Sequence, residues 1–145
     1  MTQQIINLTV ADWLTLHGEH RLVKVAPDAA LCDVLKEMLD ADSRDAYVVS
    51  HNRVIGHLGF NKLLNHLFSE ERPVHSHRQL FAQVTLADAS EIMDPHFTYC
   101  RENERINEIL HRQLQCDVSD LVVLAADNSP IGVVKLTDMV RESLL

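Results

Sequence analysis

The sequence predicts a mixed α/β (α+β) fold of two β-α-β-β-α repeats that pack through their sheets with pseudo-twofold symmetry. The first observation is duplication, because the helix caps, apolar stripes, short strands and glycines of the first half recur about 75 residues later. The second observation is size. A repeat of about 60 residues is marginal alone, and its small sheet leaves an apolar face that the twin sheet would cover.

An amphipathic helix is the clearest repeated element. In the first half, the apolar residues with the i, i+3, i+4, i+7, i+8 spacing of one helix face are Leu31, Val34, Leu35, Met38 and Leu39. In the second half, the corresponding residues are Ile106, Ile109, Leu110 and Leu114. Asp28 and Asn103 are the expected N-caps, and they stand 75 residues apart (103 − 28).

A β-hairpin is predicted after each of these helices. The predicted strand pairs are 46–49 with 54–58, and 121–124 with 131–134. Polar turn residues separate the two strands of each pair, at 50–53 and 127–130. Gly56 and Gly132 are 76 residues apart (132 − 56), so the second hairpin carries one extra residue. Asn61 and Thr137, also 76 apart, are expected to cap the closing helix of each repeat.

The remaining elements set the limits of the two repeats. Residues 9–12 resemble residues 85–88, which predicts a short opening helix in each repeat. Entry strands are expected next, at 22–25 and 97–100, and the polar stretch between the repeats is expected to be a surface connector. We therefore predict a first repeat at 1–68, a connector at 69–84 and a second repeat at 85–145.

Composition and charge exclude several classes of protein. The net charge of −8, without any run of Lys or Arg, argues against nucleic-acid binding. No apolar stretch approaches the ~20 residues of a membrane span, and the N-terminus lacks the pattern of a secretory signal. The three cysteines, Cys32, Cys100 and Cys116, form no CxxC pair, and their odd number suits thiols in a reducing compartment. A cytoplasmic location is expected.

The motifs that carry catalysis are absent, which indicates that the protein is not an enzyme. The sequence has no GxSxG elbow, HExxH, Walker loop or dinucleotide glycine fingerprint, so no catalytic residue is predicted. Nine histidines raise a metal hypothesis, above all His75 and His77 near His66. One short HxH without carboxylate or cysteine partners favours a solvated surface instead. We therefore predict no metal site and no obligatory cofactor, and keep metal sensing by these histidines as a third hypothesis.

With these repeats, the sequence resembles a tandem pair of cystathionine-β-synthase (CBS) domains, known as a Bateman module. The resemblance spans residues 10–145 and is carried by three segments, Val25-Ala26-Pro27-Asp28-Ala29-Ala30-Leu31, Ile92-Met93-Asp94-Pro95 and Ile131-Gly132-Val133-Val134-Lys135-Leu136-Thr137-Asp138. It implies a regulatory module that senses an adenosine-containing ligand, such as AMP, ADP, ATP or S-adenosylmethionine. It also implies assembly of two pairs into a disk-like homodimer.

The resemblance further implies which residues bind that ligand. The family's nucleotide grip is a glycine, an apolar residue, any residue, Ser or Thr, two residues, and then an Asp that binds the ribose hydroxyls. In the second repeat Gly132 and Asp138 match, Thr137 precedes the aspartate, and Lys135 replaces the Ser or Thr and could meet a phosphate. The adenine is expected near the entry strand and the start of the next strand, at Thr98, Tyr99, Cys100, Val118, Ser119 and Leu121.

The first repeat departs from this grip. Gly56 matches, but Gly59 stands at the Ser or Thr position and Lys62 at the Asp position, so the first site is expected to be degenerate. In the second repeat Asp120, just before a strand, would repel a phosphate.

Structural explanations for the second-repeat residues stay open. Asp138 would be stabilised by the helix dipole without any ligand, Thr137 could be only an N-cap, and Lys135 could face solvent.

Two functional hypotheses follow from the sequence. In the first, the second repeat binds an adenosine nucleotide and the protein modulates a separate, unknown protein partner. In the second, the chain is a homodimerisation or docking module without a nucleotide, and the helices predicted at 10–14 and 139–145 supply apolar contacts.

Overall fold

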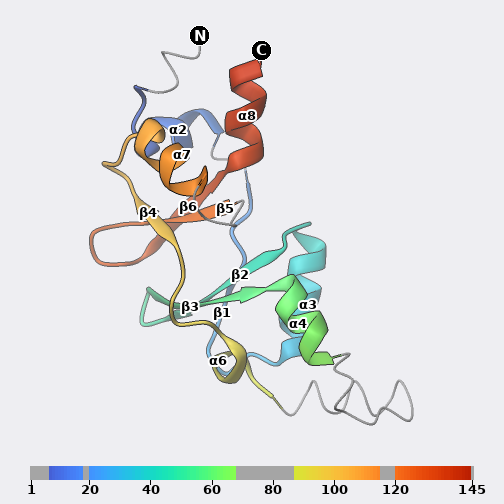
Figure 1. The fold of residues 1–145 in the computed structure, drawn as a ribbon. Helices are drawn as coiled ribbons and strands as arrows, with labels where there is room; N and C mark the ends of the chain where they lie inside the picture. Colours follow the sequence, from blue (N-terminus) through green and yellow to red (C-terminus); the bar gives the residue numbers. More distant parts are fainter. Residues whose placement is uncertain (1–6, 18–19, 68–86, 115–119, 145) are drawn as a thin grey trace. The chain divides into compact units, whose positions relative to one another are not determined.

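The computed structural model describes residues 7–17, 20–67, 87–114 and 120–144. The chain divides into two compact units. One unit comprises residues 22–97, and the other joins residues 1–21 to residues 98–145. In the described residues, each unit has a three-stranded sheet. Figure 1 shows helices beside each sheet, and the predicted mixed α+β fold is confirmed. The packing of the two sheets on each other stays a prediction.

The unit of residues 22–97 holds a sheet with the strand order β1-β2-β3. Strand β1 (Lys24–Val25) pairs parallel to β2 (Asp45–Ser50), which pairs antiparallel to β3 (Arg53–Gly59). The described residues of this unit form the helices α3 (Leu31–Asp40), α4 (Phe60–Leu67) and α6 (Ala89–Ile92). The parallel step from β1 to β2 needs a crossover, which α3 provides.

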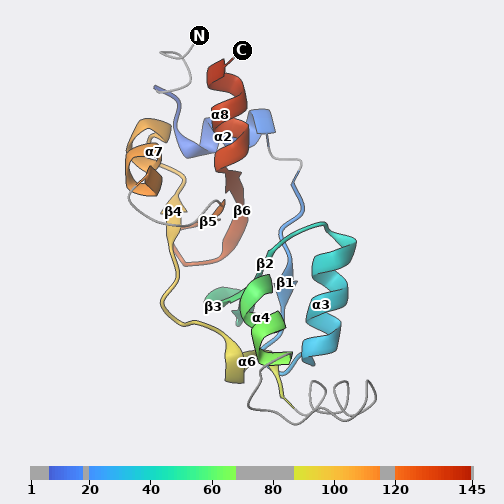
Figure 2. The ribbon, with the colours of Figure 1, turned by 45° about the vertical axis from the view of Figure 1, so that its right-hand side comes forward.

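The other unit repeats this plan with the strand order β4-β5-β6. Strand β4 (Tyr99–Arg101) pairs parallel to β5 (Asp120–Leu124), which pairs antiparallel to β6 (Pro130–Lys135). Its helices are α2 (Val10–His17), α7 (Ile106–Leu114) and α8 (Leu136–Leu144). Figure 2 shows α8 continuing directly from the end of β6, just as α4 continues from β3.

The duplication extends to irregular features of the two hairpins. Both carry a shift of register, which falls opposite the step from Val48 to Val49 in one and from Val123 to Leu124 in the other, and the extra residue lies on the last strand of each hairpin. These positions are 75 residues apart (123 − 48). Each strand residue before the shift pairs with a glycine, Gly56 or Gly132. A bulge kept at the same place in both repeats supports a common origin of the two hairpins.

The turns of the two hairpins differ by the predicted extra residue. In the first, Ser50 pairs with Arg53, and both His51 (φ 51°) and Asn52 (φ 63°) have positive φ. A two-residue loop with two positive φ values is a type I′ turn, which matches the twist of the strands. In the second, the longer turn contains Asn128 with a φ of 69°.

The two repeats exchange their opening helices. Helix α2, the opening helix of the first repeat, packs in the unit of the second repeat, where Leu14 lies against Gly132 of β6. Helix α6, the opening helix of the second repeat, packs against β3 of the first. There Met93 lies directly over Gly56. Both glycines therefore leave room for a side chain from the exchanged segment.

The helices of each unit cover one face of its sheet through a compact apolar core. In the first unit the buried core residues are Val23, Val25, Leu31, Val34, Met38, Ala46, Val48, Leu58, Leu63 and Ala89. In the second they are Val10, Trp13, Cys100, Ile106, Ile109, Leu121, Val123, Val134 and Met139. Since side chains alternate along a strand, the residues between these core positions lie on the opposite face of each sheet.

The predicted helix starts need four corrections, the first of which is that α7 begins at Ile106 and is therefore not capped by Asn103. Helix α3 begins at Leu31 with Ala30 as its N-cap, so Asp28 does not cap it. Helices α4 and α8 begin at Phe60 and Leu136 because each strand runs straight into its helix. Asn61 and Thr137 therefore lie inside the first turn instead of capping it. Among the described residues, no helix is both long and apolar enough to cross a membrane.

Candidate functional site

The predicted ligand residues of the second repeat gather at one end of the β4-β5-β6 sheet. Asp120 at the start of β5 lies opposite Lys135 at the end of β6. Strand β4 runs parallel to β5, so its first residues, with Thr98 just before them, lie at the same end. Helix α8 starts there directly after Lys135 and carries Thr137 and Asp138 in its first turn. The sheet register therefore brings most of the predicted site together.

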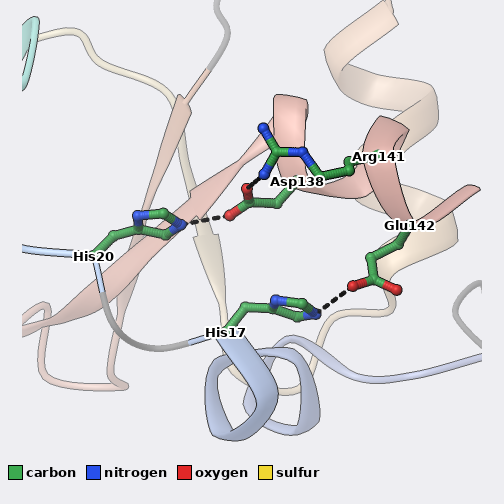
Figure 3. A network of polar contacts seen from close by, with 5 residues as sticks. All are labelled: His17, His20, Asp138, Arg141 and Glu142. Atoms are coloured by element: carbon green, nitrogen blue, oxygen red, sulfur yellow. Dashed lines mark hydrogen bonds and ion pairs between the residues drawn. The ribbon is translucent and has the colours of Figure 1, made fainter. Parts of the chain in front are cut away.

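Asp138 is the buried acid of this end of the unit. Only 7% of the residue is exposed, and ionisable side chains are rarely buried to this extent unless they are paired. Its Oδ2 lies 2.5 Å from Nε2 of His20, and its Oδ1 accepts a hydrogen bond of 3.3 Å from Nη1 of Arg141. Figure 3 shows the carboxylate held between these two side chains, which explains how a carboxylate is tolerated at this depth.

A second contact between a histidine and a carboxylate lies beside the first. Nε2 of His17, at the end of α2, lies 3.4 Å from a carboxylate oxygen of Glu142, one helical turn after Asp138 (Figure 3). The His17 ring also packs on Trp13, with 4.3 Å between ring centroids. The exchanged helix α2 and the segment that follows it therefore supply two histidines to two acids of α8.

Tyr99, Thr98 and Lys135 have side chains that a ligand can reach. Thr98 is exposed and Tyr99 is 42% exposed, with its ring 5.1 Å from the Arg101 guanidinium carbon. Lys135 is half-buried and alternates with the core residue Val134, so it lies on the sheet face opposite the helices. Thr137 is exposed.

Other predicted residues lie in the core. Cys100 and Leu121 are buried in the apolar core of the unit, so only their backbone atoms could meet a ligand. Burial, assisted by the charge of Glu104, raises the pKa of the Cys100 thiol to about 12, which keeps it protonated and unreactive near neutral pH. Gly132 faces Leu14. Val118 and Ser119 lie outside the described residues.

The first repeat has a different polar group at the matching end of its sheet. Asp45 occupies the place of Asp120, and its Oδ1 lies 2.7 Å from Nε2 of His57. The His57 ring packs near Tyr47, with 5.2 Å between centroids. Lys62, at the position of the ribose-binding aspartate, is exposed. The first repeat thus presents no acid at that position.

His20 was missed by sequence reasoning. It lies 118 residues before Asp138, outside both repeated grips, and no local pattern marks it. The exchange of opening helices, which brings residues 1–21 into the unit of the second repeat, places it there. The weak similarity between residues 9–12 and 85–88 predicted that helix, but it did not predict the unit in which the helix packs.

Comparison with known families and structures agrees with this architecture. The family model "CBS domain" matches residues 89–145. No curated protein matches the chain. A putative archaeal homolog of the γ subunit of AMPK from Methanocaldococcus jannaschii has a similar fold, with a TM-score of 0.79 at 20% identity over 98% of this chain. The chain spans 50% of that protein's length.

Two further solved structures match along almost their whole length. The CBS-pair protein CBSX2 from Arabidopsis thaliana gives a TM-score of 0.75 at 20% identity, covering 95% of both chains. A structure of CBSX2 in complex with AMP gives 0.70 at 22% identity, covering 94% of this chain and 96% of that one. The predicted tandem CBS arrangement is confirmed at the level of the fold, and the family model supports it for the second repeat.

Proposed function

We propose that this chain, which has the fold of a tandem CBS pair and a CBS domain at residues 89–145, is a regulatory module that binds an adenosine nucleotide at its second repeat. The observation that carries the proposal is Asp138, a buried carboxylate in the first turn of α8, at the position of the family's ribose-binding aspartate. AMP in the CBSX2 complex supports the choice of ligand class.

The chemistry of the sheet end suits a ribose more than a chain of phosphates. A carboxylate has two oxygens that can accept from the two hydroxyls of a ribose. The start of α8 offers backbone N–H groups that favour one anion, and Lys135 adds a positive charge. Asp120, directly opposite Lys135, opposes a larger negative charge. The expected order of affinity is therefore AMP above ATP.

In the proposed role, a separate protein partner responds to whether a nucleotide is bound at this site. The role is therefore regulatory and not catalytic. A bound nucleotide changes the equilibrium between conformations only by the difference in its affinity for them. The elements available to respond are those that hold Asp138, namely α8 and the segment that carries His20.

Isothermal titration with AMP, ADP, ATP and S-adenosylmethionine tests the proposal. AMP should bind the wild type, and Asp138→Asn should weaken binding by about 10-fold or more, since hydrogen bonds to a charged group contribute about 1.5–3 kcal/mol. Lys62→Ala is the matched control, because it changes the equivalent exposed position of the first repeat. Absence of binding by every compound at ~1 mM, or equal binding by Asp138→Asn, would contradict the proposal.

The alternative is a homodimerisation module without a nucleotide. The predicted contacts need correction, because Val10 and Trp13 of α2 and Met139 of α8 are buried in the core. Among the described side chains of these helices, the large apolar ones that are exposed are instead Leu16, at 62%, and Val140, at 47%. Light scattering on the wild type and on Val140→Lys tests this alternative, which predicts a dimer that the substitution dissociates.

A further inference from the structure

We infer that His20 competes with the ligand for the Asp138 carboxylate, so that a nucleotide binds the second repeat only by displacing the His20 imidazole. This inference rests on the proposed function and adds a residue that sets the affinity of the site. It starts from the 2.5 Å contact between Nε2 of His20 and Oδ2 of Asp138.

Both oxygens of the carboxylate are already engaged. Oδ2 faces His20 and Oδ1 accepts from Arg141, and the side chain of Asp138 is only 10% exposed. The side chain of His20 is 26% exposed and that of Arg141 is 70% exposed. A ribose needs one face of the carboxylate open to two hydroxyls, so at least one of these partners must move.

Of the two partners of Asp138, His20 is the one whose displacement limits ligand binding. The Arg141 contact is longer, at 3.3 Å, and it comes from a side chain that is 70% exposed, so it costs little to break. The His20 contact is shorter and joins two partly buried groups, so it protects the carboxylate more strongly. Releasing His20 exposes Oδ2, which is the oxygen that a second hydroxyl requires.

His20 also lies close in sequence to the first repeat, so its displacement can affect that repeat. It is followed by Arg21, the last residue of its unit before Leu22 begins the other. Strand β1 starts at Lys24, four residues after His20 (24 − 20). Displacement of the imidazole therefore frees the chain segment that leads directly into the sheet of the first repeat.

The competition should depend on pH. An imidazole gains its proton between about pH 8 and about pH 5, and the protonated ring binds a carboxylate more strongly than the neutral ring. The charged and titratable groups around the pair are Arg141 and Glu142 of α8, His17 of α2, and Asp120 and Lys135 of the strand ends. Of the two histidines, only His20 contacts Asp138. Nucleotide affinity should therefore be lower where the His20 imidazole is protonated.

Titration of AMP into three histidine variants tests the inference. His20→Ala removes the competitor and should tighten AMP binding about tenfold, which corresponds to about 1.4 kcal/mol. His20→Gln keeps a donor that cannot become charged, so its AMP affinity should lose the part of the pH dependence that the imidazole contributes. The phosphate of AMP titrates near pH 6 in every variant, and the His20→Gln series measures that background. His17→Ala is the matched control, since it removes a histidine of the same network that pairs with Glu142, and it should bind AMP within about twofold of the wild type.

The outcomes separate the inference from the proposed function. If His20→Ala binds AMP as the wild type does, or more weakly, the inference is wrong while the proposed function stands. If neither protein binds any adenosine compound, the proposed function fails and the inference fails with it. Should His20→Ala not fold, the comparison of the wild type with His20→Gln across pH decides alone, and equal pH dependence in the two would overturn the inference.

Discussion

Replacing Gly56 by alanine places a methyl group where Met93 already lies. A Cβ at this position would stand 2.4 Å from Sδ, 2.8 Å from Cγ and 2.9 Å from Cβ of Met93. Rotation of the Met93 side chain moves its Sδ and Cγ, but its Cβ moves only with the backbone. That backbone is fixed by two hydrogen bonds with His57, from His57 N to Asp94 O at 2.9 Å and from Asp94 N to His57 O at 2.8 Å.

The size of the effect follows from two opposing terms. Overpacking a well-filled site costs about 1–3 kcal/mol, and replacing glycine by alanine gains about 0.4–1 kcal/mol by restricting the unfolded chain. Gly56 does not have a positive φ, so the second term applies in full. We expect Gly56→Ala to lower the free energy of unfolding by about 1–2 kcal/mol.

Gly132→Ala is the matched comparison in the other repeat. Its Cβ would stand 3.1 Å from a terminal methyl of Leu14, which a small rotation relieves. The two terms then nearly cancel, and we expect a change within about 0.5 kcal/mol.

Urea unfolding of both variants, and of Gly56→Ala combined with Met93→Ala, measures these effects. In the Met93→Ala background the cost of Gly56→Ala should disappear, because the contact that causes it is gone. The reasoning is refuted if Gly56→Ala unfolds at the wild-type urea concentration, if Gly132→Ala is equally destabilised, or if the cost persists without the Met93 side chain.

Three further predictions concern the hairpin turn and two titrating groups. Asn52→Gly should raise the free energy of unfolding, measured by urea titration, by about 0.5 kcal/mol. The reason is that glycine suits the second positive-φ position of the type I′ turn, which follows His51. Unchanged or lower stability would contradict that turn type. Since burial, then Glu104, raises the pKa of Cys100 from 9.0 to about 12, the unfolded chain loses this proton first, and stability should fall as pH rises from about 9 to about 12. Cys100→Ala should remove that part of the slope, and an identical slope in both proteins would count against it. Burial opposes ionisation of Glu104, but hydrogen bonds from Arg112 and from the backbone of Arg101 lower its pKa below 4.5 overall, so its stabilisation holds above about pH 4.5 and is lost on acidification. Acid unfolding of Glu104→Gln should show a shallower loss over this range, and a steeper one would contradict the assignment.

Much of the fold could be predicted because its signals are local and occur twice. The apolar stripe from Leu31 and its copy from Ile106 located α3 and α7. The glycine spacing also predicted the extra residue of the second hairpin, which the pairing of Leu124 with Pro130 confirms. Helix starts were less predictable, because β3 and β6 run into α4 and α8 without the polar cap that marks a start.

The candidate site could be predicted only where its residues belong to the repeat. The register of β4, β5 and β6 places Lys135 and the start of β4 at the same end of the sheet, while the binding role of these residues stays a prediction. The partners of Asp138 were not predictable, because His20 reaches it through the exchange of opening helices, a long-range feature that leaves no periodic pattern. The sequence also gave no reason to expect the close contact of Met93 with Gly56, since it too arises from that exchange.

The most direct measurement is an NMR titration of the isotope-labelled protein with AMP, followed residue by residue through its backbone amides. AMP should shift the amides of 135–141 together with those of Thr98 and His20, and it should leave those around Lys62 unchanged. Shifts confined to the first repeat, or no shift at any amide at ~1 mM AMP, would contradict this prediction.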